Sequence, residues 1–594
     1  MIRSIRSILR IAPLRVAALL VSAGAGLSPG AHAAAAPTPA PTPVLRSATY
    51  GEMDPAINPD YKYSEWPNTP PPDCPFARSK DIGRFVFTGR YAVYQYADTW
   101  YPAWAKDGNC YSCYTDGDFR QSPDGVAYQC TSGAPDYPWS TGQAKIVGDD
   151  PLNLGFVYLG KMYSGHFIYP CISLAAAGQY TIGTYTAFGD EGNYFTGFRT
   201  SADPDHFALE REDNWVNPYW TNAVDRVKHN FFGEKGQAKF RVLHGVNFGQ
   251  DNRLSPDGKI YLTAHGFAGG AGRNDWDKGD AIYLCRVGAK PRQINNPAAY
   301  EFFAGPDAKG RPRWSPKIAE CQPILAWPNH LGSEGLTWNP GLKKFLLFSC
   351  RLSENEIGGK GQPYNMMTAW EADRITGPYR LVHYLRNWGP QTYFPNIPSK
   401  FISADGKTAW LVTSSNYATP GGKADPDSCR YACSMHEIKF LKPGEPMPKP
   451  PALGKNIAPQ AAISVVSTLA GSDPKGLVDG VVDGAPHAPA KEWASHGCRQ
   501  DAWLRLDWEH PVTIDRVRLW DRPMKGEQIL AGRLLFSDGS TEYLRAWLSD
   551  GARAPGEVSF PAKTVTWMKF YVDQVTATTQ NSGLSEIEVY QAGD

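Results

Sequence analysis

The sequence predicts an all-β protein in which a five-bladed β-propeller is followed by a β-sandwich. First, its 594 residues include 58 glycines and 50 prolines, a turn-rich composition that suits many short strands. Second, strand-like runs recur at short spacing across residues 75–440, and the pattern contains no long amphipathic helix. Third, a proline-rich linker at 441–455 precedes a last stretch, 456–594, which has the size of one sandwich.

The first 33 residues predict a signal peptide rather than a part of the fold. Arginines precede an apolar stretch at 16–27, and Ala-His-Ala at 31–33 has the small-x-small pattern of a cleavage site. The apolar stretch is too short for a permanent anchor, and no later segment reaches about 18 apolar residues. Residues 34–74 read as an Ala/Pro-rich linker and N-terminal extension. We therefore expect a secreted or periplasmic protein without a membrane span.

The region 75–440 is longer than a single sandwich needs. A propeller uses about four strands per blade, so five blades with long loops fit about 365 residues, and seven tight blades are the alternative. Asp-Gly pairs at 107–108, 257–258 and 405–406 predict turns before strands. The predicted strand runs are 84–96, 155–160, 259–265, 281–287, 344–350 and 409–415.

The stretch after the linker also consists of strand-like runs. Residues 503–508 alternate between two faces, which marks a half-buried strand. The predicted strand runs in this stretch are 501–508, 513–522, 532–540, 565–572 and 583–590.

Charge and cysteine content narrow the partners and the compartment. The net charge is +1, so no basic field is present to hold a nucleic acid, and a neutral glycan fits better. The 19 Trp and 30 Tyr either line carbohydrate sites or fill β cores. All 11 cysteines follow the signal, and in an oxidising compartment we expect disulfides, with Cys110–Cys113 and Cys429–Cys433 as local candidates and buried thiols as the alternative. We expect a monomer.

The densest cluster of chemistry-bearing residues is 97–118. Cleavage of a glycosidic bond needs two carboxyl groups, one protonated and one acting as base or nucleophile. A hairpin whose turn contains Asp107 would bring Asp98 and Asp116 together at its other end, so these two are the catalytic candidates. The alternative is that Asp98 caps a turn and Asp116 belongs to one more Asp-Gly turn.

Polar and aromatic residues in this cluster and in later loops are candidates for substrate binding. Asp251, Arg253 and His265 could face one pocket across a hairpin, where loops carry function. The alternative for a lone histidine is a structural role. The alternative for Asp150 is a turn residue. The substrate-binding candidates are Trp100, Tyr101, Trp104, Asp150, Asp251, Arg253, His265, Glu334, Tyr393, Asn396 and Lys400.

The C-terminal stretch resembles the discoidin, or coagulation-factor type C, domains. The resemblance rests on W-x-x-L-x-W, I-x-x-V-x-L and the terminal G-L-x-E-I-x-V-Y, and it covers nearly all of 456–591. It implies a jelly-roll sandwich of the galactose-binding-like type that serves as a carbohydrate-binding module. It also implies a structural calcium, for which Asp479 and Glu586 are the candidate ligands.

The region 75–440 is similar to a group of secreted bacterial proteins related to five-bladed propeller glycosidases, including the endo-D-arabinanases of glycoside hydrolase family 183. The resemblance rests on D-T-W-Y-P-x-W-A-x-D-G, S-P-D-G-K-x-Y-L-x-x-H-G and related blocks. It implies a sugar site at the propeller axis, with Asp98 and Asp116 as acid and base. Cys110, Cys113 and residues 247–252 depart from the typical pattern, so furanoside specificity does not follow.

Three functions are open at this stage. The first is a secreted glycoside hydrolase acting on a plant or microbial polysaccharide, such as an arabinofuranoside-containing glycan, with no cofactor for catalysis. The second is a polysaccharide lyase, in which His244, His265 and Tyr393 act as base and acid and Arg253 neutralises a uronate. The third is a glycan-binding protein without catalysis.

Overall fold

The computed structural model confirms the all-β class. Strands connected by turns and very short helices make up the described part of the chain. In that part, no helix is long and apolar enough to cross a membrane. The predicted signal peptide at 1–33 lies outside it. The described residues are 57–119, 128–130, 140–162, 168–188, 192–206, 231–232, 239–267, 276–357, 363–390, 392–415 and 431–593.

One sheet joins the beginning of the larger region to its end. Its strands, in spatial order, are β1 (Ile57–Asn58), β2 (Arg84–Val93), β23 (Tyr431–Leu441) and β22 (Thr408–Ser415). β2 pairs antiparallel with β23, so the first long strand completes a sheet whose other main strands come from the end of the region. Because β1 pairs with β2, the folded part begins before residue 75.

Two sheets follow in chain order. The strands of the first are β3 (Tyr96–Asp98), β4 (Ala103–Trp104), β5 (Cys110–Phe119), β6 (Tyr128–Cys130), β7 (Thr141–Val147) and β8 (Gly155–Met162). The strands of the second are β9 (Ile168–Ala176), β10 (Gln179–Phe188) and β11 (Gly192–Ser201), all paired antiparallel.

A ten-stranded sheet follows, in which two antiparallel groups meet. They are joined where β12 runs parallel to β18, with Val246 opposite Leu336. The first group is β12 (Leu243–Asn247), β13 (Lys259–Gly266), β14 (Gly279–Gly288), β15 (Glu301–Pro306), β16 (Pro312–Ser315) and β17 (Leu325–Leu331). The second group is β18 (Glu334–Asn339), β19 (Lys344–Ile357), β20 (Pro363–Ala372) and β21 (Arg380–Pro390).

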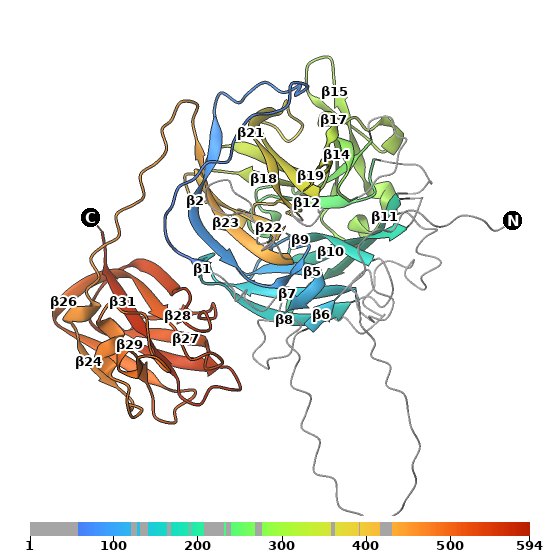
Figure 1. The fold of residues 1–594 in the computed structure, drawn as a ribbon. Helices are drawn as coiled ribbons and strands as arrows, with labels where there is room; N and C mark the ends of the chain where they lie inside the picture. The colour runs from blue at the N-terminus through green and yellow to red at the C-terminus, as the bar shows by residue number, and fades with distance from the viewer. Residues whose placement is uncertain are drawn as a thin grey trace, which may run out of the picture. The chain divides into compact units, whose positions relative to one another are not determined.

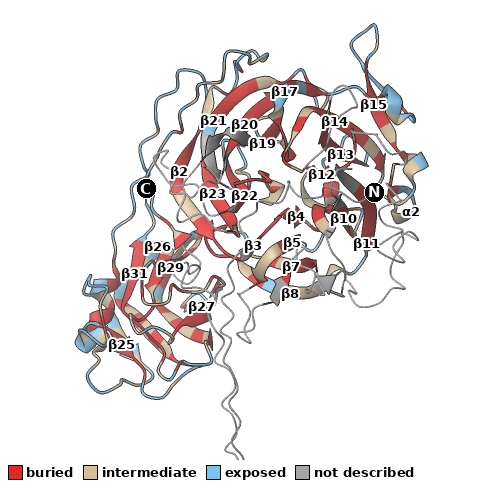
Figure 2. Cartoon of the chain, turned by 45° about the vertical axis from the view of Figure 1, so that its right-hand side comes forward, coloured by how far each residue is buried: buried red, intermediate tan, exposed pale blue. Residues whose placement is uncertain are grey.

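The five strand groups follow one another round a common centre, near which β12 and β22 lie (Figures 1 and 2). Neighbouring groups touch through strands near the centre. β3 contacts β22 and β23, β5 contacts β9, β9 contacts β12, and β12 contacts β18. Polar side chains on these strands are therefore brought together although they are far apart in the sequence.

Residues 456–593 form a separate set of strands. β26 and β29 are long and pair with each other, with irregular register between Asp507 and Val512. β31 adds to β26, and β25 pairs with β30. The strands are β24 (Ala462–Val465), β25 (Trp493–Ala494), β26 (Trp503–Trp520), β27 (Ile529–Phe536), β28 (Thr541–Leu544), β29 (Gly556–Val575), β30 (Gly583–Leu584) and β31 (Glu586–Gln591).

The helices in the described part of the chain are all short, and they connect strands. One is a single α-helical turn, and the others are 3₁₀ turns. They are α2 (Pro291–Ile294), η2 (Pro204–His206), η4 (Gln250–Asn252), η5 (Pro297–Ala299), η6 (Ile318–Glu320), η8 (Ser399–Phe401), η9 (Ala458–Gln460), η10 (Pro474–Val478) and η11 (Pro489–Lys491).

Burial follows the strands, which are largely buried in Figure 2. One apolar cluster is made only of residues between Ile457 and Val589, so the C-terminal stretch has a core of its own. The larger region contains several apolar clusters rather than one. The predicted Asp-Gly turns are confirmed: Gly108, Gly258 and Gly406 have φ of 90°, 70° and 74°, a left-handed backbone that glycine adopts without a steric penalty.

The predicted pairing of Cys110 with Cys113 is absent from the structure. The ten cysteines among the described residues form no disulfide with one another, most of them are buried, and Cys429 lies outside these residues. Cys110 and Cys113 are three positions apart on β5, so their side chains point to opposite faces and enter different apolar clusters. The two thiols therefore cannot approach each other in this strand.

Candidate active site

The two aspartates predicted as a catalytic pair lie on the paired strands β3 and β5, close enough for the charge of Asp116 to act on Asp98. β3 and β5 pair antiparallel with Asp98 opposite Thr115, which puts Asp116 at the next position along β5. Asp107 lies in the turn between β4 and β5, as predicted. The hairpin therefore brings Asp98 and Asp116 together and leaves Asp107 at its far end.

The two carboxyl groups have different surroundings. Asp98 is only 4% exposed, whereas Asp116 is half-buried. Burial raises the pKa of Asp98 well above its usual value, and the nearby charge of Asp116 raises it further. Hydroxyl groups of Thr99 and Tyr393 donate hydrogen bonds to the Asp98 oxygens at 2.6 and 2.5 Å, and these oppose the shift in part. This environment favours a protonated Asp98 next to a more exposed carboxylate.

Aromatic side chains surround the pair. The rings of Trp276 and Tyr431 lie 4.6 and 6.3 Å from that of Tyr393, the donor to Asp98. Burial raises the pKa of Tyr431 well above its usual value, and the charges of both aspartates add to this. The pair thus lies among tyrosines that stay protonated and can donate hydrogen bonds.

The backbone around the pair adopts a conformation that non-glycine residues avoid. Thr99, Asp116 and Phe394 have φ of 67°, 45° and 54°. The amide of Thr99 donates to the hydroxyl of Ser414 at 2.9 Å, and that of Phe394 donates to Ser333 at 3.3 Å. Backbone strain of this kind concentrates at functional sites, because the surrounding structure must hold it.

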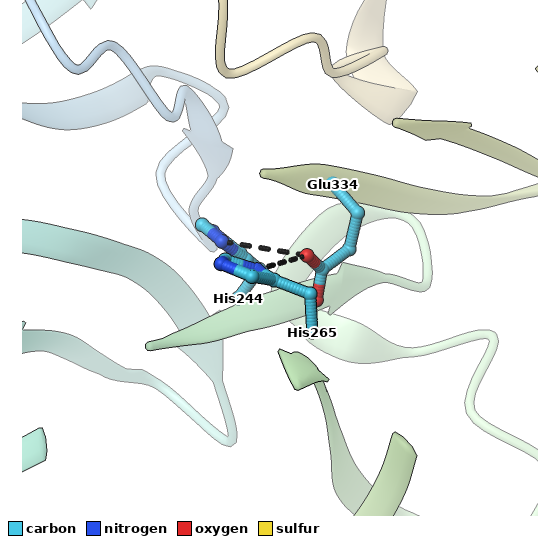
Figure 3. Close-up of side chains that lie close together, drawn as sticks. All are labelled: His244, His265 and Glu334. Atoms are coloured by element: carbon cyan, nitrogen blue, oxygen red, sulfur yellow. Dashed lines mark hydrogen bonds and ion pairs between the residues drawn. The ribbon is translucent and has the colours of Figure 1, made fainter. Parts of the chain in front are cut away.

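A second polar cluster consists of His244, His265 and Glu334 (Figure 3). It is close to the acid pair, because Phe394, which follows Tyr393, lies with its ring 6.1 Å from that of His244. Nδ1 of His265 lies 2.8 Å from Oε2 of Glu334, and Nε2 of His244 lies 3.7 Å from the same oxygen. All three side chains are buried. Sequence reasoning expected His265 and Glu334 as separate binding residues and did not foresee their contact.

A small cavity adjoins this cluster. Its volume is about 10 Å³, which is room for about one water-sized sphere. His244, Glu334, Tyr101, Asn247 and Asn396 contribute to its lining. The hydroxyl oxygen of Tyr101 is buried and has no hydrogen-bond partner among the described residues. Polar groups therefore converge on this cavity from several strands.

The three aromatic residues expected to meet sugar have different positions. Trp100 is fully buried, is stacked on Tyr114 with ring centroids 5.2 Å apart, and donates from Nε1 to Ala97 O. Its ring is part of a core, so the expectation that it stacks on a sugar is corrected. Tyr101 lines the small cavity, and Trp104 is half-buried on β4.

Asp251 and Arg253 do not face one pocket with His265. Both lie before Lys259, the first residue of β13. His265 lies at the other end of that strand, about 20 Å from Lys259 at about 3.3 Å per residue. The Asp251 carboxylate accepts the amide of Gly178, and it lines a separate cavity of about 510 Å³. Arg253 is exposed and contacts Gln250. The shared pocket predicted for the three residues is therefore wrong.

Asp150 and Lys400 have local structural partners. Asp150 accepts the amide of Leu152 at 3.0 Å in the turn after β7, and burial raises its pKa to about 6. Lys400 donates to the carbonyls of Gly108 and Gly148. These contacts fit the turn interpretation of Asp150 and give Lys400 a role in holding loops together. Neither residue lines the small cavity.

Asn396 joins the two parts of the centre. Its Nδ2 donates to the carbonyls of Trp100 and Phe394, both at 3.0 Å, and its side chain also lines the small cavity. It is thus close to both Tyr101 and the segment that carries Tyr393.

In the C-terminal stretch, Asp479 and Glu586 lie near each other. Glu586 accepts the amide of Gly480 at 3.2 Å, and burial together with the charge of Asp479 raises its pKa to about 8. Asp479 accepts the amide of Val481 and pairs with Lys491 at 2.7 Å.

Comparisons with known proteins concern mainly this C-terminal stretch. Residues 456–590 match a family described as a domain of unknown function (DUF7402). No curated protein matches the chain.

Several solved structures are similar to the chain. A structure described as a glycoside hydrolase is 10% identical, with 83% of this chain and 99% of that chain covered and a TM-score of 0.30. The lectin domain of lectinolysin complexed with Lewis B antigen is 21% identical, with 24% and 100% covered and a TM-score of 0.20. SpGH29 is 18% identical at a TM-score of 0.18, and 24% of this chain matches 28% of SpGH29. TM-scores this low do not define a shared fold.

Several residues of the centre were missed as site residues by sequence reasoning. His244 entered only as a candidate lyase base, and Trp276 and Tyr431 were not singled out. A strand pattern does not distinguish an inward-facing aromatic or histidine that meets the centre from one that fills a core. Their positions depend on contacts between different sheets.

Proposed function

We propose that the protein is a secreted glycoside hydrolase whose acid pair is Asp98 and Asp116, with a carbohydrate-binding module at its C-terminal end. The observation that carries the proposal is the unequal surroundings of two adjacent carboxyl groups. Burial favours the protonated form of Asp98, which suits an acid that protonates the leaving oxygen. The more exposed Asp116 then suits the role of base or nucleophile.

The architecture that best accounts for the strands is a five-bladed propeller followed by a β-sandwich. Five strand groups follow one another round a centre, and the pairing of β2 with β23 would close the last blade with the first long strand. In such a fold the acid pair, Tyr101, Asn396 and the histidine cluster all belong to the axis. A glycan would bind at the axis, where loops from several blades meet.

The activity is tested with the secreted protein and a panel of polysaccharides, including arabinans, arabinogalactans, pectins and uronic-acid polymers. We expect new reducing ends and saturated products from at least one of them. Unsaturated uronate products would instead indicate a lyase. An intact polymer that is nevertheless retained would indicate a glycan-binding protein without catalysis.

Replacing Tyr393 with phenylalanine is expected to change the pH dependence of cleavage. The Tyr393 hydroxyl donates to the carboxylate of Asp98 and so lowers its pKa, which means that its loss raises the pKa of Asp98 further. The alkaline limb of the kcat/KM profile, where the acid loses its proton, should move to higher pH. Tyr379→Phe is the control, because within the described part of the chain that buried hydroxyl donates to the carbonyl of Ile375 and not to a carboxyl group. A limb that stays in place or moves to lower pH in Y393F contradicts the role of Asp98.

We also propose that Asp479 and Glu586 contribute to a structural calcium site in the sandwich. Calcium takes 6–8 oxygen ligands, so backbone carbonyls would supply further ligands besides these two carboxylates. The raised pKa of Glu586 can be tested first on the calcium-free protein, through the pH dependence of its stability. Its folded value is about 8 and its ordinary value is 4.5, so the folded state holds this proton more tightly than the unfolded state.

The free energy of unfolding of the chelated protein should therefore fall as pH rises from about 4.5 through about 8. Glu586→Gln should lose this pH dependence, whereas Glu588→Gln on the same strand should keep most of it, because the charge of Glu588 is only a minor cause of the raised pKa of Glu586. Chemical denaturation at several pH values measures the slopes. Calcium added at pH 8 should raise the melting temperature of the wild type but not of E586Q. Equal slopes in the wild type and E586Q would overturn the assignment.

A further inference from the structure

The histidine cluster contains buried polar atoms that the protein itself does not satisfy. Both ring nitrogens of His244 and Oε1 of Glu334 are buried and have no hydrogen-bond partner within the described chain. Buried polar groups are nearly always paired, because an unpaired one loses its hydration without compensation. The contact between His265 and Glu334 satisfies Nδ1 of His265 and Oε2 of Glu334. It leaves Oε1 of Glu334 and both ring nitrogens of His244 without a partner among the described residues.

Glu334 also lacks a strong cationic partner. Its ion-pair partners among the described residues are His244 and His265. The cluster thus combines a buried carboxyl group with two buried imidazoles, side chains that bind metal ions through oxygen and nitrogen.

An acidic cluster elsewhere in the molecule shows a buried carboxyl group that does have a cationic partner. Asp81, Glu371 and Asp373 bring three carboxyl groups together. There the ammonium of Lys344 lies among them, 2.6 Å from Asp373 and 3.3 Å from Glu371, and it also contacts Asp81. That cluster carries its own cation, whereas no lysine or arginine pairs with Glu334 among the described residues.

The geometry of the histidine cluster suits a metal ion. One ligand atom from each of the three side chains lies within 4.8 Å of the other two. The nitrogens of His265 and His244 lie 2.8 and 3.7 Å from the Glu334 oxygen, which brackets the spacing of about 3.4 Å between ligands in a tetrahedral site with bonds of about 2.1 Å. Figure 3 shows the three side chains converging, and the small cavity offers room for one further ligand such as water.

We propose that His244, His265 and Glu334 bind one zinc-like divalent transition-metal ion. Two imidazoles and a carboxylate favour such an ion over calcium or magnesium, which prefer oxygen ligands. The ligands belong to the adjacent strands β12, β13 and β18, so the ion joins the two antiparallel groups of the ten-stranded sheet where β12 meets β18. Its role is to hold these strands together beside the acid pair. This inference does not depend on the proposed hydrolase activity.

The first experiment uses the full-length wild type after chelation and exchange into metal-free buffer. Titration with Zn²⁺ should give one equivalent bound per chain and a higher melting temperature. Cobalt(II) in place of zinc should give the visible bands of nitrogen and oxygen ligation. Absence of stoichiometric binding would overturn the proposal, and so would thiolate-to-cobalt charge-transfer bands, which would mean that the free cysteines bind the metal.

The variants Glu334→Gln and His244→Ala then test the ligands. Each should weaken zinc binding more than about 100-fold and remove the thermal shift, because each loses a direct ligand. Asp373→Asn is the matched control, since it removes a carboxylate from the cluster that contains Lys344 and should bind zinc as the wild type does. Wild-type affinity in folded E334Q would overturn the assignment. Should that variant fail to fold, the stoichiometry and cobalt spectrum of the wild type still decide.

Discussion

Asparagine in place of Asp98 is expected to lower polysaccharide cleavage by about 10²–10⁴-fold, the range that loss of a general acid or base produces. Asp116→Asn is expected to lower it by a similar factor. Asparagine has the shape of the carboxyl group but cannot supply or accept the proton. The measurement is kcat/KM on the polysaccharide that the wild type cleaves.

The fold should survive the change at Asp98. Burial raises the pKa of Asp98 above its value in the unfolded chain, so the folded state loses stability as pH rises above that ordinary value. A neutral asparagine removes this loss, and D98N should be at least as stable as the wild type at neutral pH. The lost activity would then report chemistry rather than unfolding.

Asp107→Asn is the matched control for both variants. Asp107 lies in the turn at the other end of the same hairpin and accepts the amide of Asn109. Its replacement should leave the cleavage rate close to that of the wild type. Full activity in both D98N and D116N would show that the pair does not catalyse the reaction.

Alanine in place of Trp100 is expected to lower the free energy of unfolding by about 3–5 kcal/mol. The ring is fully buried, is stacked on Tyr114 and lies 5.8 Å from Phe156, so its removal leaves a cavity that the neighbouring strands cannot fill. Denaturant unfolding followed by circular dichroism measures the change without relying on tryptophan fluorescence.

Trp104→Ala provides the comparison, because Trp104 is half-buried on the neighbouring strand. It should cost clearly less stability than W100A. If W100A instead keeps wild-type stability but loses glycan binding, the prediction that the Trp100 ring contacts sugar would be correct.

Much of the fold was predictable because it is encoded locally. The Asp-Gly turns, the strand runs and the linker at 441–455 depend on residues that are neighbours in the chain, and the structure contains them. The pairing of β3 with β5, the strands that carry Asp98 and Asp116, belongs to the same class. It needs only a hairpin with a turn at Asp107, so its existence followed from about 20 residues of sequence.

The rest of the candidate site depends on contacts between distant parts of the chain. Tyr393 is 295 positions from the aspartate to which it donates, and Glu334 is 69 positions from His265. The separation of Arg253 from His265 likewise depends on which end of β13 faces the centre. A local pattern carries no information about such distances.

The sequence by itself determined that this protein is all-β and predicted the hairpin that carries Asp98 and Asp116, because turn chemistry and strand alternation act over a few residues. Only the tertiary structure decided which side chains surround that pair. It buried Trp100 in a core, placed Tyr393 against Asp98 and joined His244, His265 and Glu334. The physical reason is that sheets packed round a centre bring together residues by their place in each sheet, and not by their order in the chain.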